Sequence, residues 1–342
     1  MVSEIHEYPS SNPNFPHNLD IHPSAIPISA QSRLQNDAPH LEAAFGSAAQ
    51  EVAIQQYGIA GRVWEASYAM TSYIDPPPNL DFDPPLFNAS ESESSRSIAI
   101  VELGSGSGLV ASTLSTLLNP SRDYLVATDL PEVCKLLEAN LKAISPLSSS
   151  NASVRGPGVT IFPVSWGNHD DALALASAFR DEATNRLTFG SLTHIICSDL
   201  VYFPELLAPL LRSLLHLSSP PFVDPSSDTT PDKRLSVFIS YKIRSLAKET
   251  PFWSAFGLWF DFSPVLSRTS SGGPDPPVWK RFGADFDDTT FLFVAHRRAE
   301  SYGWELPHSD RDLLAGVGAY GTSTTKGDDT FENLLLMSLN QD

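Results

Sequence analysis

The sequence predicts a doubly wound α/β fold, in which a mostly parallel sheet carries helices on both of its faces. Short apolar runs alternate with helical patterns along most of the chain, and a glycine-rich loop connects one of these runs to the helical pattern after it. Strand followed by helix, repeated five times, favours a parallel sheet covered on both sides. The glycine-rich loop stands where such sheets bind nucleotide-bearing ligands.

Six short apolar or β-branched runs predict the strands. They span residues 98–103, 124–128, 159–163, 193–197, 235–241 and 290–296. Helical patterns span residues 108–118, 131–143, 169–182, 203–217 and 245–257. The run at 290–296 follows no clear helix, so it fits a final antiparallel strand. The apolar run from Phe331 to Leu339 fits either a strand or a helix, because periodicity does not decide so short a piece.

Clusters of Pro, Gly and Ser interrupt this alternation at residues 75–97, 145–158, 218–234 and 267–277. We interpret them as loop insertions within one domain, because the segments between them keep the alternation of strand and helix. Residues 1–40 are rich in Pro, Asn, His and Ser without periodicity, which predicts an extended or poorly ordered arm. The expected organisation is an arm over 1–40, a single domain over 41–300 and a C-terminal extension over 301–342.

The composition narrows the class of protein. The chain has 342 residues, of which 42% are hydrophobic, and a formal net charge of −18. The apolar share is enough for a large core, which excludes global disorder. No run of Lys or Arg interrupts the acidity, so we expect no nucleic-acid partner. An acidic surface attracts basic protein segments, although solubility alone also explains such a charge.

Two cysteines, Cys134 and Cys197, lie within apolar runs, where small side chains fit. They provide neither a disulfide framework nor a cysteine zinc site, and we expect no metal. No stretch of about 18 apolar residues occurs, and the first residues lack a basic region followed by an apolar core. We therefore expect a soluble monomer of the cytoplasm, with the nucleus as an alternative compartment and no membrane contact.

The loop Gly104-Ser105-Gly106-Ser107-Gly108 gives the first chemical signal. Glycine lets the backbone turn tightly and approach a ligand without a Cβ in the way. Three alternating glycines exceed what an ordinary turn needs. A dinucleotide fingerprint would need glycine where Leu109 stands, so NAD is disfavoured. The loop also lacks the surroundings of a hydrolase nucleophile and the Gly-Lys-Ser/Thr of a phosphate loop.

Asp129 ends the second predicted strand, and 129 − 108 = 21 residues separate it from Gly108. At this spacing an acidic side chain can accept hydrogen bonds from ribose hydroxyls. The alternative is that Asp129 caps the helix that begins near Pro131. We favour the ribose role because the glycine loop precedes it.

Four blocks follow one another along the chain, together with the shorter Ser165-Trp166-Gly167. They are Gly61 to Ala66 (GRVWEA), the glycine block opened by Glu102, Ala127 to Val133 (ATDLPEV) and Ser198 to Tyr202 (SDLVY). Over residues 55–300 the sequence resembles the seven-β-strand (class I) protein-lysine methyltransferases, in the nicotinamide N-methyltransferase-like branch with its D-x-x-Y motif. The resemblance implies a Rossmann-like, seven-stranded sheet with one antiparallel strand, and S-adenosyl-L-methionine as the cofactor.

The resemblance also implies which residues bind the cofactor. Trp64 would lie over it, Trp166 would border the adenine, and Ser198 would contribute at the end of the fourth strand. The other cofactor-binding residues would be Glu102, Gly104, Ser105, Gly106, Gly108 and Asp129. An ordinary core residue is the alternative for Trp64, and a turn residue is the alternative for Ser198.

The block Asp199-Leu200-Val201-Tyr202 bears on the acceptor. Methyltransferases that act on amide or base nitrogens typically carry Asn or Asp followed by two prolines at this point, so the resemblance implies a protein side-chain amine. Asp199 would orient the amine, and Tyr202 would be the second catalytic residue. Tyr241 would be a further aromatic wall for the substrate. The alternatives are that Asp199 caps the helix near Phe203 and that Tyr241 belongs to the core.

The expected reaction is direct transfer of the sulfonium methyl to a neutral lysine amine of a protein that presents a basic segment. Lysine is protonated at neutral pH, so the site should favour the neutral amine by partial desolvation. Arginine, histidine and small amines are alternative acceptors. A non-catalytic S-adenosylmethionine-binding module and an NAD-dependent oxidoreductase are the alternative functions.

Overall fold

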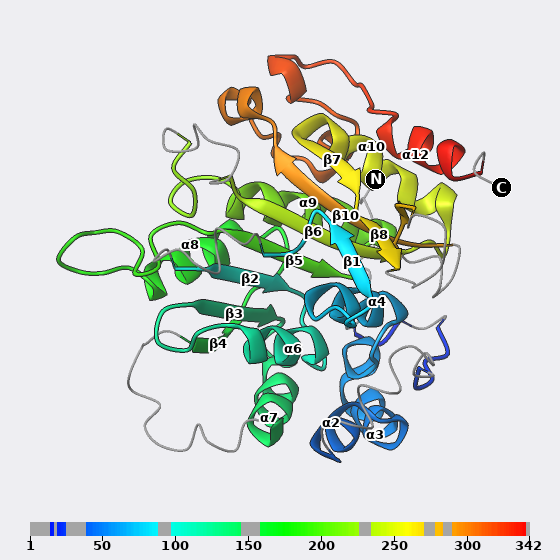
Figure 1. The fold of residues 1–342 in the computed structure, drawn as a ribbon. Coiled ribbons are helices and arrows are strands. Elements are labelled where there is room, and N and C mark those ends of the chain that lie inside the picture. Colours follow the sequence, from blue (N-terminus) through cyan, green and yellow to red (C-terminus); the bar gives the residue numbers. More distant parts are fainter. Residues whose placement is uncertain are drawn as a thin grey trace, which may run out of the picture.

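The structure is a computed structural model (Figure 1). It describes residues 14–16, 19–24, 39–87, 97–144, 158–225, 234–269, 278–282 and 289–339. The predicted loop insertion at 145–158 therefore lies outside the described residues, except for Gly158. No helix in the described part of the chain is both long and apolar enough to cross a membrane.

Seven strands among the described residues form the central sheet, in the order β4-β3-β2-β5-β6-β10-β7. Their bounds are β2 Ala99–Leu103, β3 Tyr124–Asp129, β4 Gly158–Pro163, β5 His194–Ser198, β6 Ser236–Lys242, β7 Phe260–Pro264 and β10 Thr290–Arg297. Strand β10 runs antiparallel to both β6 and β7, and the remaining pairs are parallel. The predicted mostly parallel sheet with one antiparallel strand is confirmed.

The five predicted helices are present, with ends that differ from the predicted ones by a few residues. They are α6 Leu109–Leu117, α7 Cys134–Ile144, α8 His169–Ala178, α9 Pro204–Leu217 and α10 Leu246–Trp259. Before the sheet the chain forms α2 Pro39–Phe45, α3 Ser47–Tyr57, the 3₁₀ turn η1 Gly58–Gly61 and α4 Glu65–Ile74. After it come η3 Ala299–Gly303, α11 Asp310–Leu314, η4 Ala319–Gly321 and α12 Thr330–Leu339. The last apolar run is thus a helix.

Strand β2 shows why both faces of the sheet are covered. All five of its residues are buried, and successive side chains point to opposite faces. Val101 packs in a core formed with α8, α9 and α10, whereas Ile100 packs in a second core formed with α4, α6 and α7. The helices of the two cores lie on opposite faces of the sheet (Figure 1). Phe331 of α12 is fully buried in the first core, so the C-terminal extension completes the domain.

Two predicted loop insertions contain strands of a second, antiparallel sheet. Its order is β1-β8-β9, with β1 at Leu80–Asp83, β8 at Leu266–Thr269 and β9 at Lys280–Arg281. The prediction of loop structure was wrong at residues 80–83 and 267–269, whereas β9 lies outside the predicted insertions. Phe82 and Phe282 pack edge to face in the second core, 4.7 Å apart, so this sheet is held by long-range contacts that leave no local signal.

Candidate functional site

A cavity of about 230 Å³ lies at the carboxyl ends of β2, β3 and β5. The chain leaves β2 toward β3 on one side and returns to β5 on the other, so this edge is the switch point at which doubly wound sheets bind ligands. Most of the predicted site residues line this cavity. They are Trp64, Glu102, Gly104, Ser105, Gly106, Asp129, Trp166, Ser198, Asp199 and Tyr202.

The glycine loop forms the floor of the cavity in a conformation that favours glycine. Gly104 and Gly106 have φ values of +60° and +53°. A Cβ at Gly104 would lie 2.8 Å from side-chain atoms of Leu200 and Trp166, so any other residue would collide there. Gly108 does not line the cavity and instead precedes the first turn of α6.

Asp129 turns its carboxylate toward the glycine loop. It accepts hydrogen bonds from the backbone N–H of Gly106 at 2.7 Å and of Leu130 at 2.8 Å. Helix α7 begins only at Cys134, and neither bond reaches it, which argues against the helix-cap alternative. Burial raises the pKa of Asp129 to about 6. A carboxylate accepts about four hydrogen bonds, so acceptor capacity remains on the cavity side.

Glu102 brings a second carboxyl group to the cavity. It is 2% exposed, and burial raises its pKa to about 8, with the Asp129 carboxylate acting in the same direction. No hydrogen bond of standard geometry reaches its Oε2 atom or the Oγ atom of Ser105, although the Ser105 hydroxyl lies near enough to Glu102 to oppose the rise of its pKa. Buried polar atoms in native proteins nearly always have partners, so open ones that line a cavity indicate polar groups on a ligand.

Trp64 lies directly before α4 and lines the cavity with a half-buried ring, which argues against an ordinary core role. Its indole N–H donates to the carbonyl of Ile59 at 2.9 Å. The guanidinium carbons of Arg62 and Arg244 lie 4.4 Å and 5.0 Å from the ring centre, at cation–π distance. The ring is therefore held in place by polar contacts on its edge and faces.

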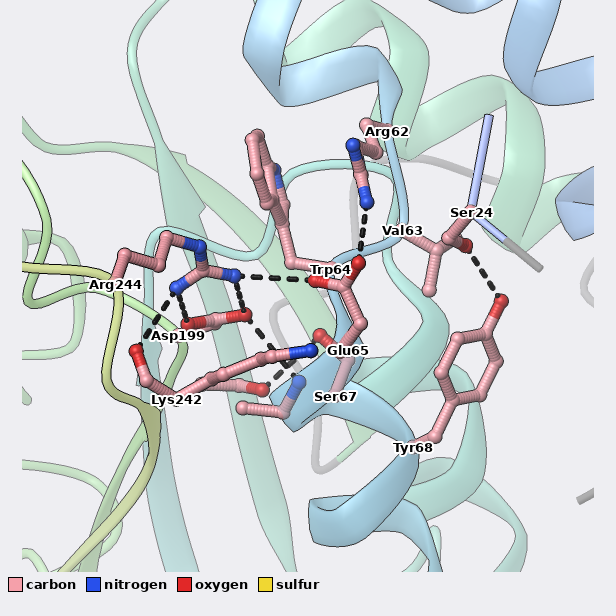
Figure 2. A network of polar contacts seen from close by, with 12 residues as sticks. Ser24, Arg62, Val63, Trp64, Glu65, Ser67, Tyr68, Asp199, Lys242 and Arg244 are labelled. Atoms are coloured by element: carbon pink, nitrogen blue, oxygen red, sulfur yellow. Dashed lines mark hydrogen bonds and ion pairs between the residues drawn. The ribbon is translucent and has the colours of Figure 1, made fainter. Parts of the chain in front are cut away.

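Asp199, the residue after β5, is bound by Arg244 (Figure 2). The two terminal guanidinium nitrogens of Arg244 donate to the two carboxylate oxygens of Asp199 at 2.5 Å and 2.6 Å. The backbone N–H of Ala66 also donates to this carboxylate, at 3.3 Å. Its φ of +62° is unusual for a residue with a side chain. No side chain caps α9, so the predicted capping alternative is not observed there, and Asp199 instead meets the first turn of α4.

Sequence reasoning missed Arg244 and Glu65, which complete this network. The Glu65 carboxylate pairs with Arg62 and accepts a bond from Arg244 at 3.1 Å. Glu65 belongs to the GRVWEA block, and Arg244 lies two residues after β6. The sequence offered one signal for Arg244, which is its position just after the end of a predicted strand. Basic residues are scarce in this chain, with only 22 Lys and Arg, so such a position stands out.

The hydroxyl groups beside Asp199 form a short chain. Ser240 donates to Ser198 at 3.0 Å, and Ser198 donates to Ser67 at 3.1 Å. Ser67 and Ser198 both line the cavity. Ser198 is thus connected to α4 across the cavity wall.

Tyr202 and Tyr241 occupy different environments. Tyr202 lines the cavity with its ring edge toward Trp166, 6.4 Å between ring centres, and burial raises the pKa of its hydroxyl. Tyr241 is fully buried, donates its hydroxyl to Glu249 and packs on Trp253 of the first core. The structure does not bring Tyr241 to the cavity, because side chains alternate along β6 and Ser240 takes the side that faces Ser198.

A second cavity of about 220 Å³ adjoins the first. Four residues line both cavities: Ile59, Trp64, Asp199 and Tyr202. The second cavity is otherwise lined by Leu19, Phe203, Pro204, Arg244, Ser245, Lys248 and Glu249. The D-x-x-Y residues thus lie at the boundary between the two cavities.

Residues 48–254 match the model of a family described as lysine methyltransferase. Solved structures that the chain matches include the CurJ carbon methyltransferase, at 13% identity and a TM-score of 0.36 over 78% of this chain and 64% of that one. A putative O-methyltransferase from Klebsiella pneumoniae matches at 12% identity and a TM-score of 0.31, over 58% of this chain and 73% of that one. Precorrin-6y C5,15-methyltransferase from Geobacter metallireducens matches at 14% identity and a TM-score of 0.28, over 60% and 83%. The chain spans less than two thirds of the CurJ protein.

Proposed function

Because the chain belongs to the lysine methyltransferase family, we propose that it methylates the side-chain amine of a lysine in a protein substrate. S-adenosyl-L-methionine is the cofactor that this family uses, as the sequence predicted. The observation that carries the proposal is the pair of adjoining cavities that meet at Trp64, Asp199 and Tyr202. One cavity is assigned to the cofactor and the other to the acceptor side chain.

The residues of the first cavity fit this cofactor. Asp129 has acceptor capacity for ribose hydroxyls, and the open Oε2 atom of Glu102 can accept from an ammonium or hydroxyl group. The ring of Trp166 offers a flat apolar face for the adenine, and Gly104 and Gly106 allow close backbone approach. When bound, the cofactor supplies an electrophilic methyl group for direct displacement by the acceptor nitrogen.

The second cavity suits the side chain of a lysine. Leu19, Phe203 and Pro204 offer apolar surface to its four methylene groups, and such stems bury readily along apolar walls. Tyr202 presents an aromatic ring at the boundary between the cavities, where it can stabilise a methylated ammonium by cation–π contact.

The charge beside the acceptor cavity favours a neutral amine. Asp199 has both carboxylate oxygens bound by Arg244, so in this arrangement it does not offer a free carboxylate to an incoming ammonium. The other carboxylate of the acceptor cavity, Glu249, already accepts hydrogen bonds from the Tyr241 hydroxyl and from the backbone N–H groups of Arg244 and Ser245, so it does not offer a free carboxylate to an ammonium either. We propose that the acceptor lysine loses its proton to water before it reaches Tyr202. Asp199 then acts by holding the boundary between the cavities in place.

The acidity of the chain supports a protein partner with a basic segment around the acceptor. A formal net charge of −18 attracts such a segment during encounter. This contribution weakens at high ionic strength, because salt screens charges separated by more than about 10 Å at 0.1 M.

The test is to incubate the purified protein with tritiated S-adenosylmethionine and a cell lysate, and to locate the label by mass spectrometry. The control is Gly106→Val, because a side chain at Gly106 would enter the cofactor loop and its Cβ would lie 3.2 Å from the carbonyl of Ala60. We expect label on lysine with the wild type and none with the variant. Label confined to arginine, histidine or small amines would overturn the lysine assignment while leaving the family unchanged.

A further inference from the structure

Two residues of the predicted N-terminal arm line the two cavities, although the family match begins only at residue 48. Asn14 lines the first cavity and is 6% exposed. Leu19 lines the second cavity and is 40% exposed, so its side chain remains available to a ligand. Both residues lie outside the part of the chain that matches the family.

A buried amide anchors the described residues 19–24 of this arm to the domain. The Oε1 atom of Gln50 accepts from the backbone N–H of Ser24 at 3.0 Å and from that of Val63 at 3.1 Å. The hydroxyl groups of Ser24 and Tyr68 lie 3.0 Å apart in a further hydrogen bond (Figure 2). Ser24 is 2% exposed and Gln50 is 1% exposed. The amide of Gln50 therefore connects Ser24 to Val63, the residue directly before Trp64.

A second anchor lies closer to the cavities. The carbonyl of Asn14 accepts from the backbone N–H of Ile59 at 2.9 Å, and the carbonyl of Ile59 accepts from the indole of Trp64. Gly58 has a φ of +57°, and a Cβ there would lie 1.7 Å from the Asn14 carbonyl oxygen. The close approach of Asn14 thus depends on glycine at position 58. Ile59 itself lines both cavities.

We infer that Asn14 and Leu19 are binding residues of this enzyme: Asn14 contacts the cofactor, and Leu19 contacts the aliphatic stem of the acceptor side chain. The part that concerns Leu19 rests on the proposed lysine methylation. Leu19 adds a wall to the acceptor cavity from outside residues 48–254, the part of the chain that matches the family. Leu19 is therefore a specificity-determining residue, and its size sets which acceptors enter.

The contact of Asn14 with the cofactor is tested without turnover. Stopped-flow measurement of S-adenosylhomocysteine dissociation should show at least a fivefold faster rate for Asn14→Ala. The matched control is Asn333→Ala, at an exposed position of α12 away from both cavities, and its rate should equal that of the wild type. Equal rates for Asn14→Ala and the wild type would overturn this part of the inference.

The contact of Leu19 with the acceptor is tested by Leu19→Trp, which enlarges the side chain at the cavity wall. Its matched control is Leu173→Trp, because Leu173 is 43% exposed on α8 and lines neither cavity. We expect Leu19→Trp to bind S-adenosylhomocysteine within about threefold of the wild type, a difference under 1 kcal/mol. Labelling of lysines in the lysate should fall at least tenfold, and the control should label like the wild type.

The outcomes separate the inference from the proposed function. If the wild type labels lysines and Leu19→Trp labels the same proteins at the same rate, the role of Leu19 is wrong and the proposed function stands. If the wild type binds S-adenosylhomocysteine but labels no lysine, the proposed function fails, and with it the role of Leu19. Should Leu19→Trp fail to fold, Leu19→Ala replaces it, and we expect this wider cavity to change the set of labelled proteins.

Discussion

The guanidinium of Arg244 forms a two-pronged ion pair with the carboxylate of Asp199. The Asp199 side chain is fully buried, whereas that of Arg244 keeps 27% exposure on the side of the acceptor cavity. Planar guanidinium and carboxylate groups match in such pairs, and lysine does not reproduce this geometry. The pair connects the end of β5 to the segment after β6, and through Glu65 it also reaches α4.

Loss of Arg244 should destabilise the fold because it leaves a buried carboxylate without a counter-charge. We expect Arg244→Gln to lower the free energy of unfolding by about 2–3 kcal/mol. This loss is smaller than for a fully buried ion pair, because Arg244 stays partly exposed. The double variant Asp199→Asn with Arg244→Gln should recover most of this loss, because an amide pair carries no charge. Urea unfolding checks both, and equal stability of the single and double variants would contradict the role of the pair.

Replacement of Asp129 should affect the cofactor more than the fold. Asp129→Asn keeps the size of the side chain but removes its charge and one of its two acceptor oxygens, so the affinity for S-adenosylhomocysteine should fall by about 1–3 kcal/mol. Calorimetric titration measures the affinity and thermal unfolding measures the stability. A lower melting temperature with unchanged affinity would assign Asp129 to loop structure alone, through its bonds to Gly106 and Leu130.

Glu102 should make the stability of the free protein depend on pH. Its pKa is about 8 in the fold against 4.5 in the unfolded chain, so the native state holds this proton more tightly. The contribution to stability is therefore fully present below pH 4.5 and is lost as the pH rises through about 8. Relative to Glu102→Gln, the wild type should lose at least about 1.4 kcal/mol between pH 5 and pH 8.5, which corresponds to one pKa unit.

Urea unfolding of both proteins at the two pH values provides this measurement. Asp129 also has a raised pKa, and because it is present in both proteins its contribution largely cancels in the comparison. Parallel pH profiles for the wild type and Glu102→Gln would show that Glu102 does not hold the proton. Saturating S-adenosylhomocysteine should reduce the difference, because its polar groups meet the open oxygen of Glu102.

Local patterns predicted the parts of the fold that form from consecutive residues. Strand β2, the glycine loop and α6 follow one another directly, and their apolar periodicity and glycine spacing are visible in the sequence. Strand β7 was missed because Phe260 continues the apolar run of α10 without a break, so no turn residue marks the change from helix to strand. The small sheet was missed because β1 pairs with β8 across most of the domain.

The same distinction applies to the site. Asp129 and the glycine loop lie within one strand–helix–strand unit, so spacing was enough to connect them. Arg244 was missed because its partners Asp199 and Glu65 are far from it in sequence and meet it only in the folded chain. Leu19 was missed because a Pro-rich, aperiodic segment carries no signal that it packs against a domain, and the amide of Gln50 that holds Ser24 lies inside a helix.

Substitution of Tyr202 should affect turnover, because Tyr202 lines both cavities, whereas substitution of Tyr241 should affect stability, because Tyr241 lies in the core. Tyr202→Ala removes the ring at the boundary, and we expect it to lower kcat at least tenfold, about 1.4 kcal/mol of transition-state stabilisation. Tyr202→Phe keeps the ring and should cost less. Tyr202→Phe keeps the ring edge toward Trp166, so its affinity for S-adenosylhomocysteine should stay within about threefold of the wild type.

Tyr241→Phe provides the matched comparison, since it removes a hydroxyl that donates to Glu249 inside the protein. Loss of this buried hydrogen bond should lower the free energy of unfolding by about 1–3 kcal/mol and leave kcat within twofold of the wild type. A labelled-methyl assay on lysate proteins and urea unfolding separate the two effects. If Tyr241→Phe slowed methyl transfer as much as Tyr202→Ala while both remained folded, the boundary between the cavities would not be the place where the acceptor reacts.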